Sequence, residues 1–180
     1  MKRYAAIALL LLITAPVPAQ KTSQRDRSVS DYYFPKNSFS TDNDSDAFRQ
    51  IWYGKHLDVL DREKLTVHQN AIRFTYLRTF HGPFSIKTTW NGSEKTVLTF
   101  SMSNGAGGYG AGILTTRFRR KLTAAQLGEL IGLTKKYDIF DQPSTIEEPV
   151  CDGSQWIIEI NIDGKYKRRI AAQYIISVNI

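Results

Sequence analysis

The chain has 180 residues, of which 42% are apolar and 23% are charged, and its formal net charge is +7. This size and composition are typical of one globular domain and exclude a wholly disordered chain. The single cysteine excludes an internal disulfide and any zinc site that needs two thiolates.

Residues 1–19 have the layout of a secretory signal peptide. Lys2 and Arg3 precede an apolar stretch from Tyr4 to Ala15, which is shorter than the ~20 residues that a membrane-spanning helix needs. Cleavage after Ala19 leaves 180 − 19 = 161 residues with a net charge of +7 − 2 = +5. We therefore expect a periplasmic or secreted protein without a transmembrane anchor after cleavage. An uncleaved anchor is the alternative.

Residues 20–43 are polar and show no sustained period, which predicts a flexible lead-in. Within it, the cluster from Tyr32 to Pro35 is expected to dock on the domain. A helix is expected from about Asp44, with an apolar stripe made of Phe48, Ile51, Trp52, Val59 and Leu60. Carboxylates favour a helix N-terminus, which here holds Asp42, Asp44 and Asp46. The same run resembles the start of a calcium loop, but Ala47 and Tyr53 replace the glycine and glutamate that such a loop needs.

From Ala71 onward apolar and polar residues alternate, which predicts strands. The first strand ends before Gly82-Pro83, and the next begins at Phe84. Asn91-Gly92 is a strong turn signal, and Val97–Met102 returns as a third strand.

A glycine-rich segment, Asn104–Gly112, precedes a further strand at Ile113–Arg119. It contains the spacing G-x-G-x-x-G, but a dinucleotide site needs this spacing to open a helix. We interpret it as a connection between two strands with Tyr109 packed at its tip; a flexible edge close to a ligand is the alternative. No cofactor is predicted.

A second helix is expected after Thr123, which forms a capping box with Gln126. For the last strand pair, a three-residue loop at residues 162–164 is expected, because it places Tyr166 beside Ile160 and Glu159 opposite Lys167. The order of elements predicts a single α+β domain over residues 44–180, with an antiparallel sheet of about five to six strands packed against two helices.

Charges on apolar strand faces need a partner or a cleft, and this applies to Arg78 and Arg168. Arg78 is close to His81 at a strand end, which indicates either a buried ion pair or a basic pocket for an anion. The carboxylates around Cys151 disfavour a thiolate, so this residue is not predicted to be a nucleophile. The three histidines lack metal-ligand spacing, and no metal site is predicted.

A basic patch is expected around Phe118, made of Arg117, Arg119, Arg120 and Lys121. Such a run is typical of a solvated strand end. The alternative is a contact with an anionic partner.

Four groups of residues together resemble a family of uncharacterised exported bacterial proteins. They are Arg-Phe-x-x-Leu-Arg-x-Phe-His-x-Pro over residues 73–83, Gly-Gly-Tyr-x-x-Gly over 107–112, Asp-Gly-Ser-x-Trp-x-x-Glu over 152–159 and Gly-x-Tyr over 164–166. The family has no assigned activity. The resemblance implies a bacterial origin and a common ligand-binding unit made of Arg78, His81, Tyr109, Asp152, Trp156 and Glu159.

These observations favour a non-catalytic binding or interaction domain of the bacterial envelope, with an anionic or macromolecular partner and no nucleic acid. The rival hypothesis is a small hydrolase or transferase in which Arg78 holds an anion and His81 or Glu159 acts as acid or base. A third hypothesis is self-association through the apolar end at Ile175–Ile180.

Overall fold

The computed structural model describes residues 33–35, 38–39, 41–65, 70–92, 95–146 and 153–174. The predicted signal peptide, Cys151, Asp152 and the segment Ile175–Ile180 lie outside the described residues. The elements in chain order are α1 (Asn43–Leu60), β1 (Asn70–Arg78), β2 (Phe84–Asn91), β3 (Lys95–Ser103), β4 (Leu114–Lys121), α2 (Ala124–Lys136), β5 (Thr145–Ile146), β6 (Gly153–Ile162) and β7 (Lys165–Tyr174).

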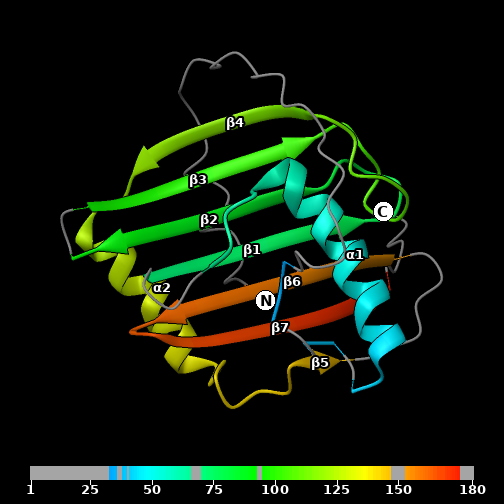
Figure 1. Cartoon of the computed structure of the whole chain (residues 1–180). Helices are drawn as coiled ribbons and strands as arrows, with labels where there is room; N and C mark the ends of the chain where they lie inside the picture. Colours follow the sequence, from blue (N-terminus) through cyan, green and yellow to red (C-terminus); the bar gives the residue numbers. More distant parts are fainter. Residues whose placement is uncertain are drawn as a thin grey trace, which may run out of the picture.

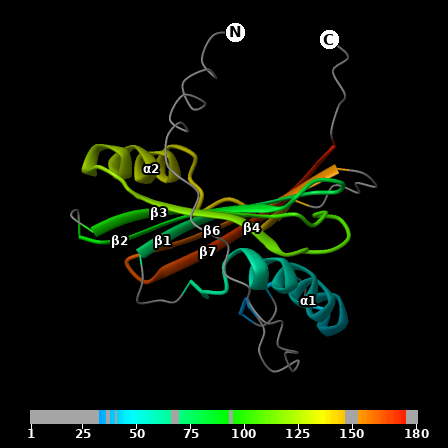
Figure 2. The same ribbon diagram turned by 90° about the horizontal axis from the view of Figure 1, so that it is seen from above.

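A single sheet forms the middle layer, with the strand order β4-β3-β2-β1-β6-β7-β5. Six of these strands pair antiparallel, and the two-residue β5 adds a short parallel contact to β7. Helices α1 and α2 cover opposite faces of the sheet (Figures 1 and 2). The predicted α+β class, with an antiparallel sheet packed against two helices, is confirmed.

Each face of the sheet carries its own apolar core, because side chains of one strand point alternately to the two faces. The core on the α1 side consists of Tyr33, Phe34, Phe39, Tyr53, Leu57, Leu77, Ile157 and Ile170. The core on the α2 side is built around Ile72, Trp90, Leu127 and Ile160. The two central strands β1 and β6 are therefore buried on both faces.

Part of the predicted lead-in belongs to the α1-side core. Tyr33 and Phe34 are buried, which confirms the expected docking of this cluster, and Phe39 is buried with them. The side chain of Gln50 accepts a hydrogen bond from the Phe34 amide at 3.1 Å and donates to the Pro35 carbonyl at 2.8 Å. These contacts fix residues 33–35 against α1.

Helix α1 begins as predicted, but it buries a different face. Asp42 caps it by accepting a hydrogen bond from the Ser45 amide at 2.9 Å. Phe48 and Ile51, which the predicted stripe placed inward, are exposed. The buried face instead carries Asp46, Gln50, Tyr53, His56, Leu57 and Leu60. The predicted stripe was wrong at Phe48 and Ile51, whereas Leu60 is buried as expected. The inward-facing Asp46 and Gln50 bond to backbone groups of residues 34–39, which no periodicity within α1 reveals.

Helix α2 has the predicted capping box: the Thr123 hydroxyl accepts from the Gln126 amide at 3.2 Å, and the Gln126 side chain accepts from the Thr123 amide at 3.0 Å.

The predicted register of the last hairpin is wrong. Ile162 pairs with Lys165, so Asp163 and Gly164 form a two-residue loop and Lys167 lies opposite Ile160. Both loop residues have positive φ, 52° for Asp163 and 77° for Gly164, as a type I′ turn requires. The apolar pattern could not choose this register because β6 is buried on both faces. Glu159 consequently faces Arg168 rather than Lys167.

Candidate functional site

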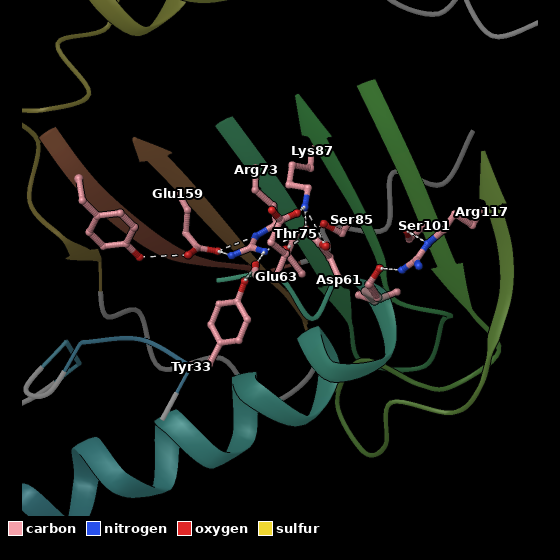
Figure 3. Close-up of polar contacts among 12 residues, drawn as sticks. Tyr33, Asp61, Glu63, Arg73, Thr75, Ser85, Lys87, Ser101, Arg117 and Glu159 are labelled. Carbon is pink, nitrogen blue, oxygen red and sulfur yellow. Dashed lines mark hydrogen bonds and ion pairs between the residues drawn. The ribbon is translucent and has the colours of Figure 1, made fainter. Parts of the chain in front are cut away.

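A buried ion cluster lies between the sheet and α1, and Arg73 is its centre (Figure 3). Arg73 is fully buried, and it donates to Oε2 of Glu159 from Nε at 2.8 Å and from Nη2 at 2.5 Å. Its Nη1 donates to Asp61 at 3.0 Å and to the Glu63 carbonyl at 2.8 Å. All three guanidinium nitrogens therefore have partners, as a buried charge requires.

The cluster extends across β2 through Lys87. Its Nζ lies 2.9 Å from Asp61 and 2.5 Å from Glu63. Asp61 follows the last residue of α1, so one carboxylate joins the end of the helix to two strands. The loop that leaves α1 is thus anchored on the sheet by charge-assisted hydrogen bonds.

Two tyrosines complete the cluster. The Tyr33 hydroxyl donates to the Glu63 carbonyl at 2.7 Å, and the Tyr166 hydroxyl donates to Oε1 of Glu159 at 3.0 Å. Burial and the neighbouring Glu159 charge raise the pKa of both phenols above their usual value. Burial alone would lower the pKa of Arg73, but the Glu159 charge and then Tyr33 and Asp61 outweigh it and raise this pKa. Arg73, Tyr33 and Tyr166 thus hold their protons more tightly than free side chains do, which suits a structural support rather than an acid–base role for these three groups.

The sequence analysis named Glu159 as a candidate site residue but did not name its partner Arg73. In the alternating pattern Arg73 is predicted on the outward face of its strand. The face is in fact covered by α1 and by residues 33–35, which no periodicity within β1 reveals.

The predicted common site of Arg78, His81 and Glu159 is not formed. Glu159 pairs with Arg73 and Arg78 pairs with Ser154. Five residues of strand, about 16 Å at 3.3 Å per residue, separate Arg73 from Arg78, and side chains five residues apart point to opposite faces of the sheet. Trp156 lies on the α2 side with Glu159 on the α1 side, and Asp152 lies outside the described residues.

The backbone of Arg78 and His81, in contrast, contacts the glycine-rich segment that carries Tyr109 at one end of the sheet. The Gly107 amide donates to the carbonyls of both Arg78 and His81 at 3.0 Å, and the Gly108 amide donates to the Thr79 carbonyl at 3.1 Å. A Cβ on Gly107 would lie 2.6 Å from the Arg78 nitrogen, so glycine permits this approach. The glycine-rich segment is a connection between β3 and β4, as interpreted, and these two amides are engaged within the chain.

This contact creates an exposed surface at the end of the sheet, which we call the tip surface and define as Phe48, Trp52, Lys55, Phe80 and Tyr109. Phe48 stacks on Trp52 with ring centroids 6.5 Å apart, and Lys55 Nζ lies 3.6 Å from the Trp52 ring centroid. Lys55 also donates to the Tyr109 carbonyl at 3.3 Å, and the Tyr109 ring lies 5.7 Å from the Phe80 ring. Three segments far apart in the sequence thus share one surface.

Large apolar side chains are concentrated near the tip surface. Eight such side chains are exposed in the described part of the chain, and six of them belong to α1, the β1–β2 turn, the end of β3 or the loop after it. Phe48, Phe80 and Tyr109 are each more than 60% exposed, at 67%, 62% and 64%. The other two exposed residues, Leu133 and Tyr137, lie on or next to α2.

The predicted basic patch does not lie on one face. Arg117 donates to Ser101 at 3.1 Å and to the Leu60 carbonyl at 2.6 Å, which places its side chain on the α1 side. Arg119 and Lys121 alternate with it and share that side, whereas Arg120 faces the α2 side with Phe118. The last turn of α1 contains no basic residue, and two arginines from outside the helix bond to its C-terminal carbonyls. Arg117 donates to Leu60, and Arg62 Nε donates to the Asp58 carbonyl at 2.9 Å.

Two further polar side chains are buried on the α1 side. Arg168 lies over the Phe39 ring at 4.2 Å, and burial lowers its pKa although Tyr166 and Glu159 oppose this. His56 is fully buried, and neither ring nitrogen has a hydrogen-bond partner among the residues that the structure describes. Burial, with the Lys55 charge beside it, lowers the pKa of His56 to about 4.

Within the described residues, no three His, Cys, Asp or Glu side chains are grouped so that they could hold a metal ion. Neither of the two described helices is long and apolar enough to cross a membrane. Comparison with models of known protein families and with curated proteins finds no match for the chain.

Proposed function

We propose that this chain is an exported, non-catalytic binding domain of a bacterial envelope, and that its tip surface contacts a protein partner. The observation that carries the proposal is the tip surface, in which exposed Phe48, Phe80 and Tyr109 are joined through half-buried Trp52 and Lys55. Contiguous exposed apolar surface on a soluble domain marks an interaction site. Aromatic residues dominate the binding energy of protein interfaces, which favours a protein as the partner.

The arrangement of ionisable groups also supports a binding role. Arg73 and Glu159 are buried and paired with each other, so neither offers a charge to a substrate. The rival hypothesis needs Arg78, His81 and Glu159 to converge, and the pairing of Glu159 with Arg73, five residues from Arg78 along β1, disfavours it. Export rests on the signal-peptide pattern of residues 1–19.

Site-specific photo-crosslinking tests the proposal. A photoreactive phenylalanine analogue replaces Tyr109 in residues 20–180, and the purified protein is mixed with solubilised bacterial envelope. We expect one discrete adduct with a protein, which an excess of the unlabelled domain competes away. The matched control carries the analogue at Tyr137, which is 57% exposed but lies next to α2.

Two substitutions make the test quantitative. Phe48→Ser and Phe80→Ser should each reduce the Tyr109 adduct about fivefold or more, because each removes an aromatic contact worth ~1–2 kcal/mol at an interface. Their melting temperatures should stay close to that of the unsubstituted protein, since both side chains are already exposed. Equal adducts from Tyr109 and Tyr137, or an adduct with lipid or glycan in place of protein, would reject the proposed function.

A further inference from the structure

The edge of the sheet at β4 is open along the described part of the chain. β4 is the last strand in the sheet order and pairs only with β3 among the described strands. At the opposite edge, β5 covers part of β7. An unpaired edge presents a row of backbone donors and acceptors, and proteins either protect it or use it.

The hydrogen-bond pattern shows which residues of β4 have free backbone groups. The Leu122 amide donates to the Thr96 carbonyl at 3.1 Å, so the pair formed by these residues is hydrogen-bonded. In an antiparallel ladder hydrogen-bonded and non-hydrogen-bonded pairs alternate. Continuing the register back along β4 directs the backbone N–H and C=O groups of Arg117, Arg119 and Lys121 away from β3.

The side chains of these same three residues carry positive charge on the α1 side of the sheet. The opposite face of β4 carries Phe118, which stacks on Phe100 with ring centroids 5.1 Å apart. That stack continues across the sheet from Phe100 to Phe84 and Phe74. An added strand would therefore meet three positive charges on one face, and Phe118 with Arg120 next to it on the other.

We propose that the β4 edge binds an extended segment of a partner protein as an additional antiparallel strand. The segment alternates acidic residues, placed beside Arg117, Arg119 and Lys121, with apolar residues, one of them placed beside Phe118. The inference rests on the proposed function, because it takes the chain to be a binding domain. It adds to the tip surface a second contact, and it names the chemistry of the partner segment that this contact binds. Opposite charges at neighbouring cross-strand positions stabilise such pairing, and like charges oppose it.

Charge also decides against a second copy of this chain as the occupant. Two β4 edges placed together would bring Arg and Lys side chains of both copies into proximity, which is how natural sheets prevent edge-to-edge pairing. The same charges attract an acidic strand. The basic residues of β4 thus select one class of occupant and exclude another.

The first test uses a synthetic peptide of about nine residues, the length of an average-to-long strand, in which Glu alternates with Val and a central Phe replaces one Val. Titration into the ¹⁵N-labelled domain measures binding by nuclear magnetic resonance. Amide hydrogen exchange should slow at Arg117, Arg119 and Lys121, whose N–H groups gain acceptors. The amides of Thr116, Phe118 and Arg120 already face β3 and should change little.

Two matched comparisons separate strand addition from charge attraction alone. Arg119→Glu with Lys121→Glu should weaken peptide binding about tenfold or more by replacing attraction with repulsion. Lys135→Glu with Lys136→Glu makes the same charge change in the last turn of α2 and should leave peptide binding nearly unaltered. A peptide N-methylated at its glutamates keeps its charge but cannot donate to β4, and it should not bind.

Binding of the N-methylated peptide as tight as that of its parent, or no slowing of exchange at the three β4 amides, overturns the inference. So does the absence of peptide binding while the Tyr109 adduct persists, because the tip surface would then be confirmed without the strand contact. Phe80→Ser should reduce the adduct and leave peptide binding unchanged, so the two proposals can fail separately.

Discussion

Arg73 and Glu159 occupy directly opposed positions on β1 and β6, and two nitrogens of Arg73 donate to a single oxygen of Glu159 at 2.8 and 2.5 Å. Neither side chain is more than 1% exposed. The pair joins two neighbouring central strands whose sequences are 86 residues apart. It therefore fixes the register between the first half of the chain and the last hairpin.

Arg73→Met should destabilise the domain by about 3–5 kcal/mol, because it leaves the buried Glu159 carboxylate without its main partner. Urea unfolding followed by circular dichroism measures this change. The double variant Arg73→Met with Glu159→Leu should be more stable than Arg73→Met alone, since it removes both charges. A single variant within about 1 kcal/mol of the parent would contradict a central role for the cluster.

Protonation of His56 should make the domain less stable in acid. The pKa of its imidazole is about 4 in the folded chain against an ordinary value of 6.5, so the unfolded chain binds the proton first as pH falls. Stability from this residue is complete above pH 6.5 and is lost between 6.5 and 4, by about 3 kcal/mol in all at 1.36 kcal/mol per pH unit.

His56→Leu isolates this effect from the carboxylates that titrate in the same range. The variant removes two unpaired buried nitrogens and cannot take up a proton. The difference in unfolding free energy between variant and parent should grow in favour of the variant as pH falls from 7 to 5. A difference that stays constant with pH would show that His56 does not titrate as inferred.

In the connection between β3 and β4, substitution by alanine should destabilise the domain strongly at Gly107 and hardly at all at Gly110. A Cβ on Gly107 would meet backbone atoms of Leu77 and Arg78 at 2.6–2.8 Å, whereas a Cβ on Gly110 meets nothing within 4 Å. Gly107→Ala should destabilise by about 2 kcal/mol or more, and Gly110→Ala should stay within about 0.5 kcal/mol. Equal effects in thermal unfolding would mean that the loop does not pack closely on the β1–β2 turn.

Arg117 and Arg119 are both exposed basic residues of β4, but only Arg117 is bonded to the end of α1. Arg117→Met should cost about 1 kcal/mol, because the Leu60 carbonyl loses its donor and the helix C-terminus loses a cation. Arg119→Met should leave stability unchanged. Chemical unfolding of the two variants compares their stabilities directly. If Arg117→Met left stability unchanged, Arg117 would be a solvated residue at a strand end, as the sequence predicted.

The hairpin and capping signals predicted most of the fold. The turn at Asn91-Gly92, the alternation in β1 and β2, and the capping box at Thr123 each depend on residues close together in the sequence. The contacts of the ion cluster, in contrast, depend on residues far apart in the sequence. Arg73 meets Glu159 only because β6 returns beside β1, and local pattern contains no information about that pairing.

The same limit explains the failures on α1 and on the last hairpin. Phe48 and Ile51 are apolar yet exposed, while His56 and Gln50 are polar yet buried. Gln50 bonds to the backbone of residues 34–35, a contact that no pattern within α1 reveals. The register of β6 and β7 follows the turn geometry at Asp163 and Gly164, whose positive φ values no apolar pattern encodes. Of the tip surface, the sequence analysis named Tyr109 as a candidate site residue, but it did not predict the contribution of α1.

The close docking of the glycine-rich connection has a consequence for the thermodynamics of binding. A surface loop usually loses conformational freedom when a partner orders it, and this entropy is subtracted from the affinity. Here the segment that presents Tyr109 is already held by the Gly107 and Gly108 hydrogen bonds to the β1–β2 turn and by Lys55 from α1. The tip surface is preorganised, so the contact area it contributes should be converted into affinity with a small entropic loss.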